Sequence, residues 1–377
     1  MRVTLFILIA FMTSQWFSCT HDKFDLPTIP SAEERFQPHK AQYVLLAPLD
    51  AASGYQFVEP SDVYVAADNF VYVANTGMNR IEMLDAGGSL QGYSQYIPHP
   101  EAVTQNDSLK LLIVNKTNVI YEIDLKKYNH EIWNASVDTA FYKASQQSWE
   151  YTGISVYNKF DYYATVIDVN DSSMINHTQS ISIYDFNGDN TEKGPLPLHK
   201  DGTGLYTALV PTGIVSMRER YLDVSSQETT PAFMFCQRGK TSLLTNNFKV
   251  QSVTTTIIEG SVVLIPNTSL IGSDIYDLDK FYYPEDITID RAGFVFVVDR
   301  GAYKVDDTGT VIADTTQPLP GFYRFSSTGT QLQTVLSPTL FKMPKGIAVL
   351  PNETLQVVYV ADTGNDRILM FRLSTQF

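Results

Sequence analysis

Apolar and polar residues alternate along most of the chain in short runs that end in turns rich in Asp, Asn, Gly and Pro. A period of two places successive side chains on opposite faces of a β-strand, so this pattern predicts strands that pack against a core. Residues 60 to 84 are the clearest example. They predict a short strand from Pro60, a turn, a second apolar strand in "VYVAN", a tight turn at "TG" and a third strand opened by Arg80.

This pattern is repeated within the chain. The stretch at residues 71 to 84, "VYVANTGMNRIEML", returns at residues 358 to 371 as "VYVADTGNDRILMF", with nine of fourteen positions identical. A third copy, at residues 295 to 305, keeps the apolar run, an Asp at the turn, the Gly and a basic residue. Internal repeats at opposite ends of a chain indicate one structural unit used several times.

The spacing inside the unit is also conserved between the copies. The distance from the Pro that opens each unit to the turn Gly is 17 residues in two copies and 20 in the third: Pro60 to Gly77, Pro284 to Gly301, and Pro344 to Gly364. The three extra residues fall in a turn, at residues 352 to 356. Insertions are tolerated in loops, so this difference supports a shared unit.

The tight turn of each copy carries an Asp or Asn, a Gly two residues later and, in two copies, an Arg five residues later. The Gly is expected to supply a positive φ, and the Asp or Asn side chain to hydrogen-bond the turn backbone. The Arg can reach back to the same turn. These residues are therefore predicted to be structural: Asn75, Gly77, Arg80, Asp299, Gly301, Asp362, Gly364 and Arg367.

The pattern P-x-G-I-x-V-D, followed by V-Y-V-A-D-T-G-N-x-R-I, resembles the NHL repeat, whose units are the four-stranded blades of a β-propeller. The resemblance implies an all-β fold of six four-stranded blades over residues 43–377. Blades are expected to begin near residues 60, 100, 151, 211, 284 and 344. The last unit ends after its third strand, so Tyr43 to Ala47 is predicted to add the missing strand and close the ring.

The first eighteen residues are typical of an export signal. Arg2 precedes an apolar run from Val3 to Met12 that is too short to span a bilayer. "WFSC", which ends in Cys19, resembles the lipobox of bacterial lipoproteins, although ordinary signal cleavage stays open. Residues 1–18 are thus a predicted lipoprotein signal peptide, and residues 19–42 a lipidated Cys and tether. The chain resembles NHL-type lipoproteins of Bacteroidetes, which implies an outer-membrane lipoprotein on either face of that membrane.

Charge and cysteine content narrow the function further. The formal net charge of −14 excludes a broad electrostatic hold on nucleic acid. Only two cysteines occur, Cys19 and Cys236, and Cys236 lies in an apolar run typical of a small buried side chain. A structural disulfide between them is not expected.

In a propeller of this kind, the residues after the opening Pro enter the innermost strand, so their side chains should gather at the mouth of the central channel. The set is Asp62, Glu101, Glu285, Asp286 and Lys345. Carboxylate oxygens are the ligands that Ca²⁺ prefers, so the four acidic residues could hold this ion. The alternative is an acidic rim partly balanced by Lys345. No other cofactor is expected.

A second candidate surface lies in the insert at residues 125 to 150. It carries four aromatic side chains in a polar setting: Trp133, Phe141, Tyr142 and Trp149. Exposed rings on a loop could stack on sugars, whereas buried rings would cover the propeller core. The sequence leaves both interpretations open.

The chain contains no G-x-S-x-G, H-E-x-x-H or nucleotide-binding loop. This favours a non-enzymatic envelope lipoprotein whose propeller is a binding scaffold for a glycan, a peptide or a partner protein. The alternative is a metal-assisted hydrolase or lyase that acts at the mouth of the channel.

Overall fold

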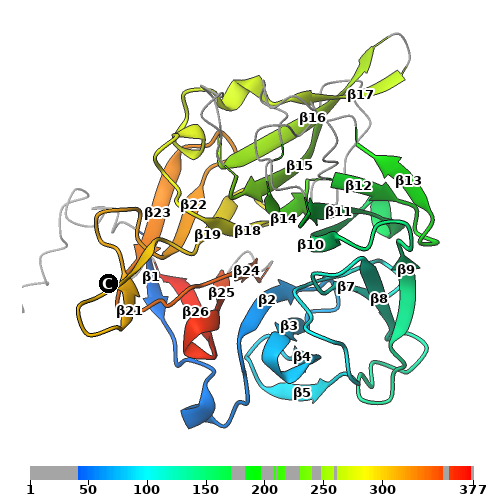
Figure 1. The fold of residues 1–377 in the computed structure, drawn as a ribbon, viewed down its shortest axis with the longest axis horizontal. Helices are drawn as coiled ribbons and strands as arrows, with labels where there is room; N and C mark the ends of the chain where they lie inside the picture. Colours follow the sequence, from blue (N-terminus) through cyan, green and yellow to red (C-terminus); the bar gives the residue numbers. More distant parts are fainter. Residues whose placement is uncertain are drawn as a thin grey trace, which may run out of the picture. The chain divides into compact units, whose positions relative to one another are not determined.

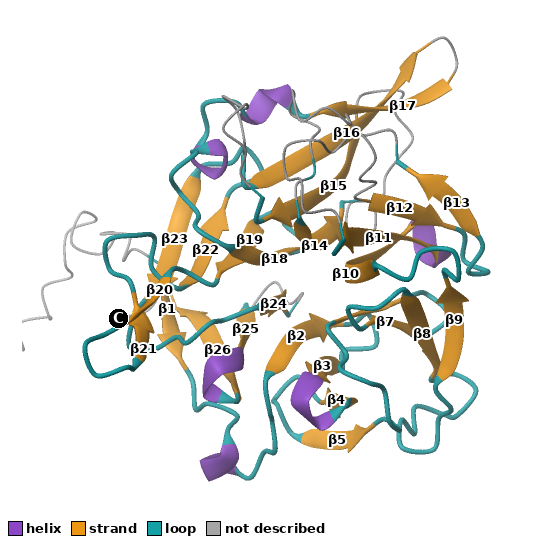
Figure 2. Cartoon of the chain, viewed as in Figure 1, coloured by secondary structure: helices purple, strands orange, loops and turns teal. Residues whose placement is uncertain are grey.

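The computed structural model describes residues 41–170, 183–196, 208, 210–217, 230–239, 248–258, 261–350 and 356–374. In these residues, six four-stranded antiparallel sheets form the blades of a β-propeller around a central channel (Figure 1). Strands make up nearly all of the regular structure (Figure 2). The predicted all-β, six-bladed fold is confirmed.

The blades follow one another along the chain, and each runs from its innermost strand outward, except that blade 6 takes its outer strand from the N-terminal side. Blades 1 to 3 consist of β2 (Pro60–Val65), β3 (Val71–Asn75), β4 (Arg80–Leu84) and β5 (Leu90–Tyr93); β6 (Ala102–Gln105), β7 (Lys110–Val114), β8 (Val119–Asp124) and β9 (Asp138–Tyr142); and β10 (Trp149–Tyr157), β11 (Asp161–Asp168), β12 (Ile183–Phe186) and β13 (Glu192–Pro195).

Blades 4 to 6 consist of β14 (Pro211–Ser216), β15 (Thr230–Gln237), β16 (Val250–Ile258) and β17 (Ser261–Pro266); β18 (Pro284–Ile289), β19 (Val295–Asp299), β22 (Gly321–Phe325) and β23 (Gln331–Leu336); and β24 (Gly346–Val349), β25 (Val357–Asp362), β26 (Arg367–Ser374) and β1 (Gln42–Leu45). The predicted blade starts therefore agree with the inner strands to within two residues.

Short elements complete the described chain. A hairpin of β20 (Tyr303–Val305) and β21 (Val311–Ala313) projects from blade 5 between β19 and β22. The helices are single 3-10 turns: η2 (Ala51–Ser53), η3 (Thr76–Met78), η4 (Asn158–Phe160), η5 (Thr268–Leu270), η6 (Asp274–Tyr276) and η7 (Thr363–Asn365). None of the helices among the described residues has the length and apolar character needed to cross a bilayer.

The ring closes as the sequence predicts. Strand β1 pairs antiparallel with β26, with Gln42 opposite Ser374 and Leu45 opposite Phe371. The Tyr43 hydroxyl also donates a hydrogen bond of 2.7 Å to Oε1 of Gln356. Closure places the two most similar repeats in neighbouring blades, because β24 of blade 6 packs against β2 of blade 1.

The hydrophobic core lies between neighbouring blades. In one cluster, Val63 and Val73 of blade 1 pack against Tyr359 and Ile368 of blade 6, and all four side chains are buried. Six such clusters in the described part of the chain each join two adjacent blades. Full burial of one such side chain contributes about 1.5–3 kcal/mol, so the blades depend on each other for stability.

The turn Asx residues anchor the loop that enters each inner strand. Asn75 Oδ1 accepts the Val58 N–H at 2.9 Å, and Asp362 Oδ1 accepts the Lys342 N–H at 2.7 Å. Asp299 accepts three backbone N–H groups, from Tyr282, Tyr283 and Gly301. All three Asx side chains are fully buried.

The two arginines of the motif differ in their partners. Arg367 donates to Asp362 Oδ2 at 2.8 Å, as expected, whereas Arg80 pairs with Glu82 at 2.7 Å. Glu82 is also the acceptor for Asn75 Nδ2. An amide at position 75 carries no charge, so the carboxylate for the arginine comes from the next strand instead.

The prediction of a positive φ is correct for Gly301, whose φ is 72°, and wrong for Gly77 and Gly364. These two glycines permit close approach. A Cβ on Gly77 would lie 2.5 Å from Val58 Cγ1, and one on Gly364 would lie 2.7 Å from the Lys342 carbonyl oxygen. The left-handed residues of these two turns are Asn79 and Asp366, two positions later.

Candidate functional site

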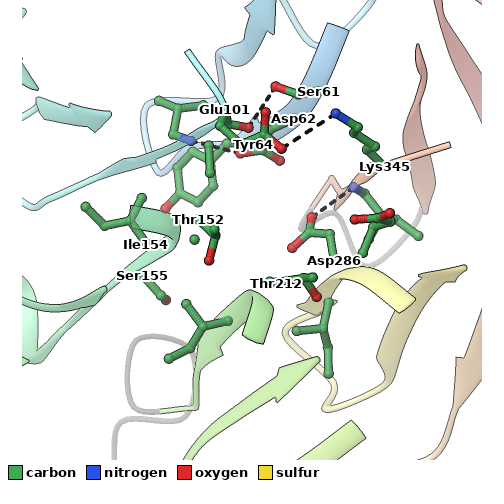
Figure 3. A pocket seen from close by; sticks show the side chains of 18 of the residues that line it. Ser61, Asp62, Tyr64, Glu101, Thr152, Ile154, Ser155, Thr212, Asp286 and Lys345 are labelled. Atoms are coloured by element: carbon green, nitrogen blue, oxygen red, sulfur yellow. Dashed lines mark hydrogen bonds and ion pairs between the residues drawn. The ribbon is translucent and has the colours of Figure 1, made fainter. Parts of the chain in front are cut away.

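A cavity of about 160 Å³ lies at the centre of the ring. Residues from all six inner strands line it, namely from β2, β6, β10, β14, β18 and β24. Ile, Val and Thr are the commonest residues of its walls, and charged groups gather among the residues that open the inner strands (Figure 3). The channel prediction therefore placed its five charged residues correctly, because Asp62, Glu101, Glu285, Asp286 and Lys345 all line this cavity.

The six repeat units open at residues 60, 100, 151, 211, 284 and 344. In each blade, the side chain of the next residue has one of two roles. In three blades it is a hydroxyl that donates to a backbone carbonyl of the next blade: Ser61 to Glu101 O at 2.8 Å, Thr152 to Pro211 O at 2.9 Å, and Thr212 to Pro284 O at 2.9 Å. In the other three blades the same position carries a charge: Glu101, Glu285 and Lys345. The three hydroxyl groups therefore link neighbouring blades, whereas the three charged side chains are available to act on a molecule in the cavity.

Each of the two glutamates has basic partners. Glu101 Oε1 lies 2.6 Å from Lys116 Nζ and 3.6 Å from Lys345 Nζ. Glu285 Oε2 is paired with Arg238 Nη2. Burial raises the pKa of Glu101, but the attraction of the nearby cations outweighs burial and leaves this pKa below its ordinary value. Glu101 is therefore ionised at neutral pH.

The second residue after the opening position is Asp in two blades, and both aspartates bridge to the next blade. Asp62 Oδ2 accepts the Val103 N–H at 2.8 Å, and Asp286 Oδ2 accepts the Ile347 N–H at 3.0 Å. Neither side chain is fully buried, and both face the cavity (Figure 3).

The two aspartates lie on either side of blade 6. A Cβ on Gly346 of blade 6 would be 2.5 Å from Asp62 Cα, so only glycine allows blade 1 to approach this closely. Burial is the main cause that raises the pKa of Asp62 to about 7, and the negative charge of Glu101 adds to it. Burial and the negative charge of Asp62 raise the pKa of Asp286 well above its ordinary value.

Both pKa values are raised, and that of Asp286 is raised in part by the charge of Asp62, so ionisation of one carboxyl favours the protonated form of the other. Two nearby carboxyls in a low-dielectric site resist double ionisation, so one loses its proton first and the other keeps it. Asp62 can accept a proton at pH values around 7, while Asp286 can donate one. This is the arrangement that separates a general base from a general acid.

The four acidic residues are not arranged as a Ca²⁺ site in this structure, so the predicted ion stays a prediction. Ca²⁺ takes six to eight oxygen ligands at about 2.3–2.6 Å, and at least one oxygen of each of the four side chains already has another partner. Glu101 and Glu285 are paired with cations, and Asp62 and Asp286 accept backbone N–H groups. Among the described residues, no group of three or more His, Cys, Asp or Glu is arranged to hold a metal.

The aromatic insert does not form one surface. Trp133 and Tyr142 are 49% and 51% exposed. Trp149 is buried against Tyr184, and Phe141 packs edge-on against Phe186 in the core between blades 2 and 3. For Phe141 and Trp149 the structure therefore favours the second interpretation, in which the rings cover the core, because strands β9 and β10 turn them inward.

Sequence reasoning missed two cations at the mouth, Lys116 and Arg238. Both occupy the position directly after the turn Asx of their blade, or after its counterpart: Asn115-Lys116 and Gln237-Arg238. In blade 1 the same position is Thr76, which donates to Ser61 at 2.7 Å. Alignment of this position across all blades would have found both cations.

Three predictions lie outside the described residues: the signal peptide at 1–18, lipidation at Cys19 and the tether up to residue 40. They stay predictions. Cys236, in contrast, is fully buried and free, as expected.

No protein-family model and no curated protein matches this chain. Several solved structures share its fold. One, a luciferin-regenerating enzyme, has a TM-score of 0.57 and 11% sequence identity, and the match covers 88% of this chain and 95% of that chain. A gluconolactonase from Xanthomonas campestris has a TM-score of 0.54 at 10% identity, with coverage of 88% and 98%.

A third similar structure is described as a calcium-binding protein, regucalcin, from Agrobacterium tumefaciens; its TM-score is 0.53 at 10% identity, with coverage of 88% and 96%. Similarity at these identities establishes the propeller fold. It does not confirm the resemblance to NHL lipoproteins, which stays a prediction.

The comparisons contradict the expectation of a non-enzymatic binding scaffold. The solved propellers similar to this chain include a luciferin-regenerating enzyme and a gluconolactonase. The expectation rested on the absence of a short catalytic motif. Such a motif is not needed when each inner strand contributes a single side chain to a site at the centre of a ring.

Proposed function

We propose that this chain is an enzyme that hydrolyses an ester bond, open-chain or cyclic, of a small substrate at the mouth of the channel. The observation that carries the proposal is the pair Asp62 and Asp286, two carboxyls that line one cavity from either side of blade 6 and whose pKa values are raised by burial. The names of similar propellers support an enzyme over a scaffold.

In the proposed reaction, ionised Asp62 takes a proton from a water molecule as the oxygen of that water attacks the ester carbonyl carbon. Lys345, whose ammonium group lies at the cavity mouth, polarises the carbonyl oxygen. The bond from the carbonyl carbon to the alcohol oxygen then breaks, and protonated Asp286 gives its proton to the leaving oxygen. The products are an alcohol and a carboxylic acid, which releases its proton to water and becomes a carboxylate. Transfer of the proton gained by Asp62 to Asp286 restores the two aspartates.

The cavity limits the size of the part that enters the channel. A cavity of about 150 Å³ holds a molecule such as benzene, and this one measures about 160 Å³. One ring with few substituents therefore fits. The wall of Thr, Ile and Val suits a neutral ring, and the charged mouth suits the ester group.

The sequence predicted Ca²⁺ at this mouth, and a calcium-binding protein is among the similar structures. No step of the proposed reaction depends on the ion, because Asp62 and Asp286 move the protons and Lys345 polarises the carbonyl; the partners of the four carboxylates lead us to expect that the mouth does not bind it.

The test is a hydrolysis assay with a panel of single-ring esters and lactones, followed as acid release at constant pH. Wild-type protein should hydrolyse at least one member, and Asp62→Asn should lower its kcat by about 10²–10⁴-fold. The matched control is Asp161→Asn, which changes an aspartate outside the cavity that pairs with Lys193. Equal rates for wild type and Asp62→Asn would overturn the proposal.

We also propose that a lipid on Cys19 holds this enzyme at a membrane. The support is the apolar export segment and the "WFSC" sequence. In bacterial cells, Cys19→Ala should move the protein from the detergent-extracted fraction to the soluble one. Persistence of the variant in the membrane fraction would contradict lipid anchoring.

A further inference from the structure

One carboxylate oxygen at the channel mouth is shared by two ammonium groups from different blades. Glu101 Oε1 lies 2.6 Å from Lys116 Nζ in blade 2 and 3.6 Å from Lys345 Nζ in blade 6. The Glu101 side chain is 12% exposed, and those of Lys116 and Lys345 are 38% and 23% exposed. The side chains of both lysines are therefore partly exposed, while the carboxylate between them is largely covered.

The Lys345–Glu101 ion pair joins two blades that are not adjacent. Blade 1 stands between blades 6 and 2, so the Lys345–Glu101 pair reaches across the inner end of blade 1, which carries Asp62 (Figure 3). The charge of Glu101 acts on Asp62 directly.

Glu285, which occupies the same position of the repeat as Glu101, differs. It is 6% exposed, and it forms an ion pair with Arg238 of the preceding blade. Its second oxygen, Oε1, is buried with no hydrogen-bond partner among the described residues. Only at Glu101 do two lysines of the described chain converge on one oxygen atom.

We propose that Lys116 and Lys345 form a binding site for the carboxylate of a ligand, and that Glu101 occupies this site in the free protein. The inference rests on the proposed function, because hydrolysis of an ester converts its carbonyl into a carboxylate at the place where Lys345 acts. The ligand class is a small organic carboxylate with one ring.

When the ligand binds, its carboxylate replaces the carboxylate of Glu101 beside the two lysines. The lysines keep a negative partner throughout, and Glu101 moves from a covered position into solvent, where its charge is hydrated. A group attached to the protein competes with free ligand at a high effective concentration. Removal of the Glu101 charge should therefore expose the site and strengthen carboxylate binding.

The test is calorimetric titration of the intact protein with benzoate, and with benzyl alcohol as a ring without the carboxylate. Glu101→Gln should bind benzoate at least about tenfold more tightly than wild type, a difference of about 1.4 kcal/mol. Addition of Lys345→Gln to Glu101→Gln should remove this gain. The matched control is Glu122→Gln, which breaks a Lys–Glu pair of 3.0 Å with Lys110 on blade 2, away from the cavity, and should bind as wild type does.

Benzoate affinity that is equal in wild type and Glu101→Gln would overturn the inference, as would a gain that survives Lys345→Gln or that benzyl alcohol reproduces. Should Glu101→Gln fail to fold, Glu101→Asp serves the same purpose, because its shorter side chain withdraws the carboxylate from Lys345. The titration involves no turnover, so failure of the ester assay and failure of this inference are separate results.

Discussion

Asp62 Oδ2 accepts a hydrogen bond of 2.8 Å from the backbone N–H of Val103, so a carboxylate that lines the channel also joins blade 1 to blade 2. Asp286 makes the corresponding bond to Ile347, between blades 5 and 6. These two side chains serve the chemistry and the ring at once, and different substitutions should separate the two roles.

Asp62→Asn and Asp62→Ala should differ in stability while both abolish hydrolysis. The Asn side chain keeps an oxygen that can accept the Val103 N–H, whereas Ala leaves this N–H without its acceptor, at a cost of about 1–3 kcal/mol. Urea unfolding of the two variants checks this difference. Equal unfolding free energies would show that the Val103 bond contributes nothing to the ring.

The rate of ester hydrolysis should rise with pH through about 7. Asp62 acts as a base only when ionised, and its pKa is raised from 3.8 to about 7. Below this value the group holds a proton and cannot accept another. Measurement of kcat/KM from pH 5 to 9 tests this rise in rate, with Asp161→Asn as the control. A profile that is already flat from pH 5 upward would exclude Asp62 as the base.

Gly364→Ala should destabilise the protein by about 1–3 kcal/mol, because the added Cβ would lie 2.7 Å from the Lys342 carbonyl oxygen. Gly87→Ala is the matched control. Gly87 also has an ordinary φ, and a Cβ there would meet only the side-chain atom Asp85 Oδ1, at 3.2 Å. Thermal melts compare the two. The close-approach explanation fails if both variants melt at the wild-type temperature.

Asp299 should make the stability of the protein depend on pH. Burial raises its pKa from 3.8 to about 6, so the folded state binds a proton between these values that the unfolded state releases, and stability falls as pH rises. The stability of wild type relative to Asp299→Asn should therefore decrease by up to about 3 kcal/mol from pH 4 to pH 7. Urea melts at both pH values test this, and a constant difference would contradict it.

Added Ca²⁺ should leave the melting temperature of chelator-treated protein unchanged, because the rim carboxylates are held by cations and backbone N–H groups. A ligand that binds only the folded state adds about 2.7 kcal/mol at a hundred times its Kd, which a melt detects. An increase in melting temperature that Asp286→Asn removes would establish a calcium site at the channel mouth and contradict this expectation.

The elements of the fold that repeat could be predicted from the sequence alone. The period of two, the spacing from Pro to Gly and the third strand at the end of the last unit predict the blades, their starts and the closing strand at Tyr43. Each of these features recurs along the chain and depends on local geometry. The five charged residues of the mouth follow from the same alignment, because a repeat fixes which positions face the channel.

The partners of those residues could not be predicted in the same way. Lys345 and Glu101 are far apart in sequence and lie in blades that are not adjacent, so their contact depends on ring curvature. The turns at Gly77 and Gly364 show a further limit. Glycine is compatible with a positive φ and with close approach, and only the position of Val58 or Lys342 decides between them.

The pairing of β1 with β26 has a consequence for how the protein folds. Gln42 and Ser374 are partners in one sheet although they lie 332 positions apart in the sequence, and contacts of this sequence separation form slowly. During synthesis, β24 to β26 emerge last, so blade 6 remains a three-stranded sheet with an open edge until β1 joins it. Assembly of the ring is thus a late event, and conditions that delay it prolong the exposure of that edge to other chains.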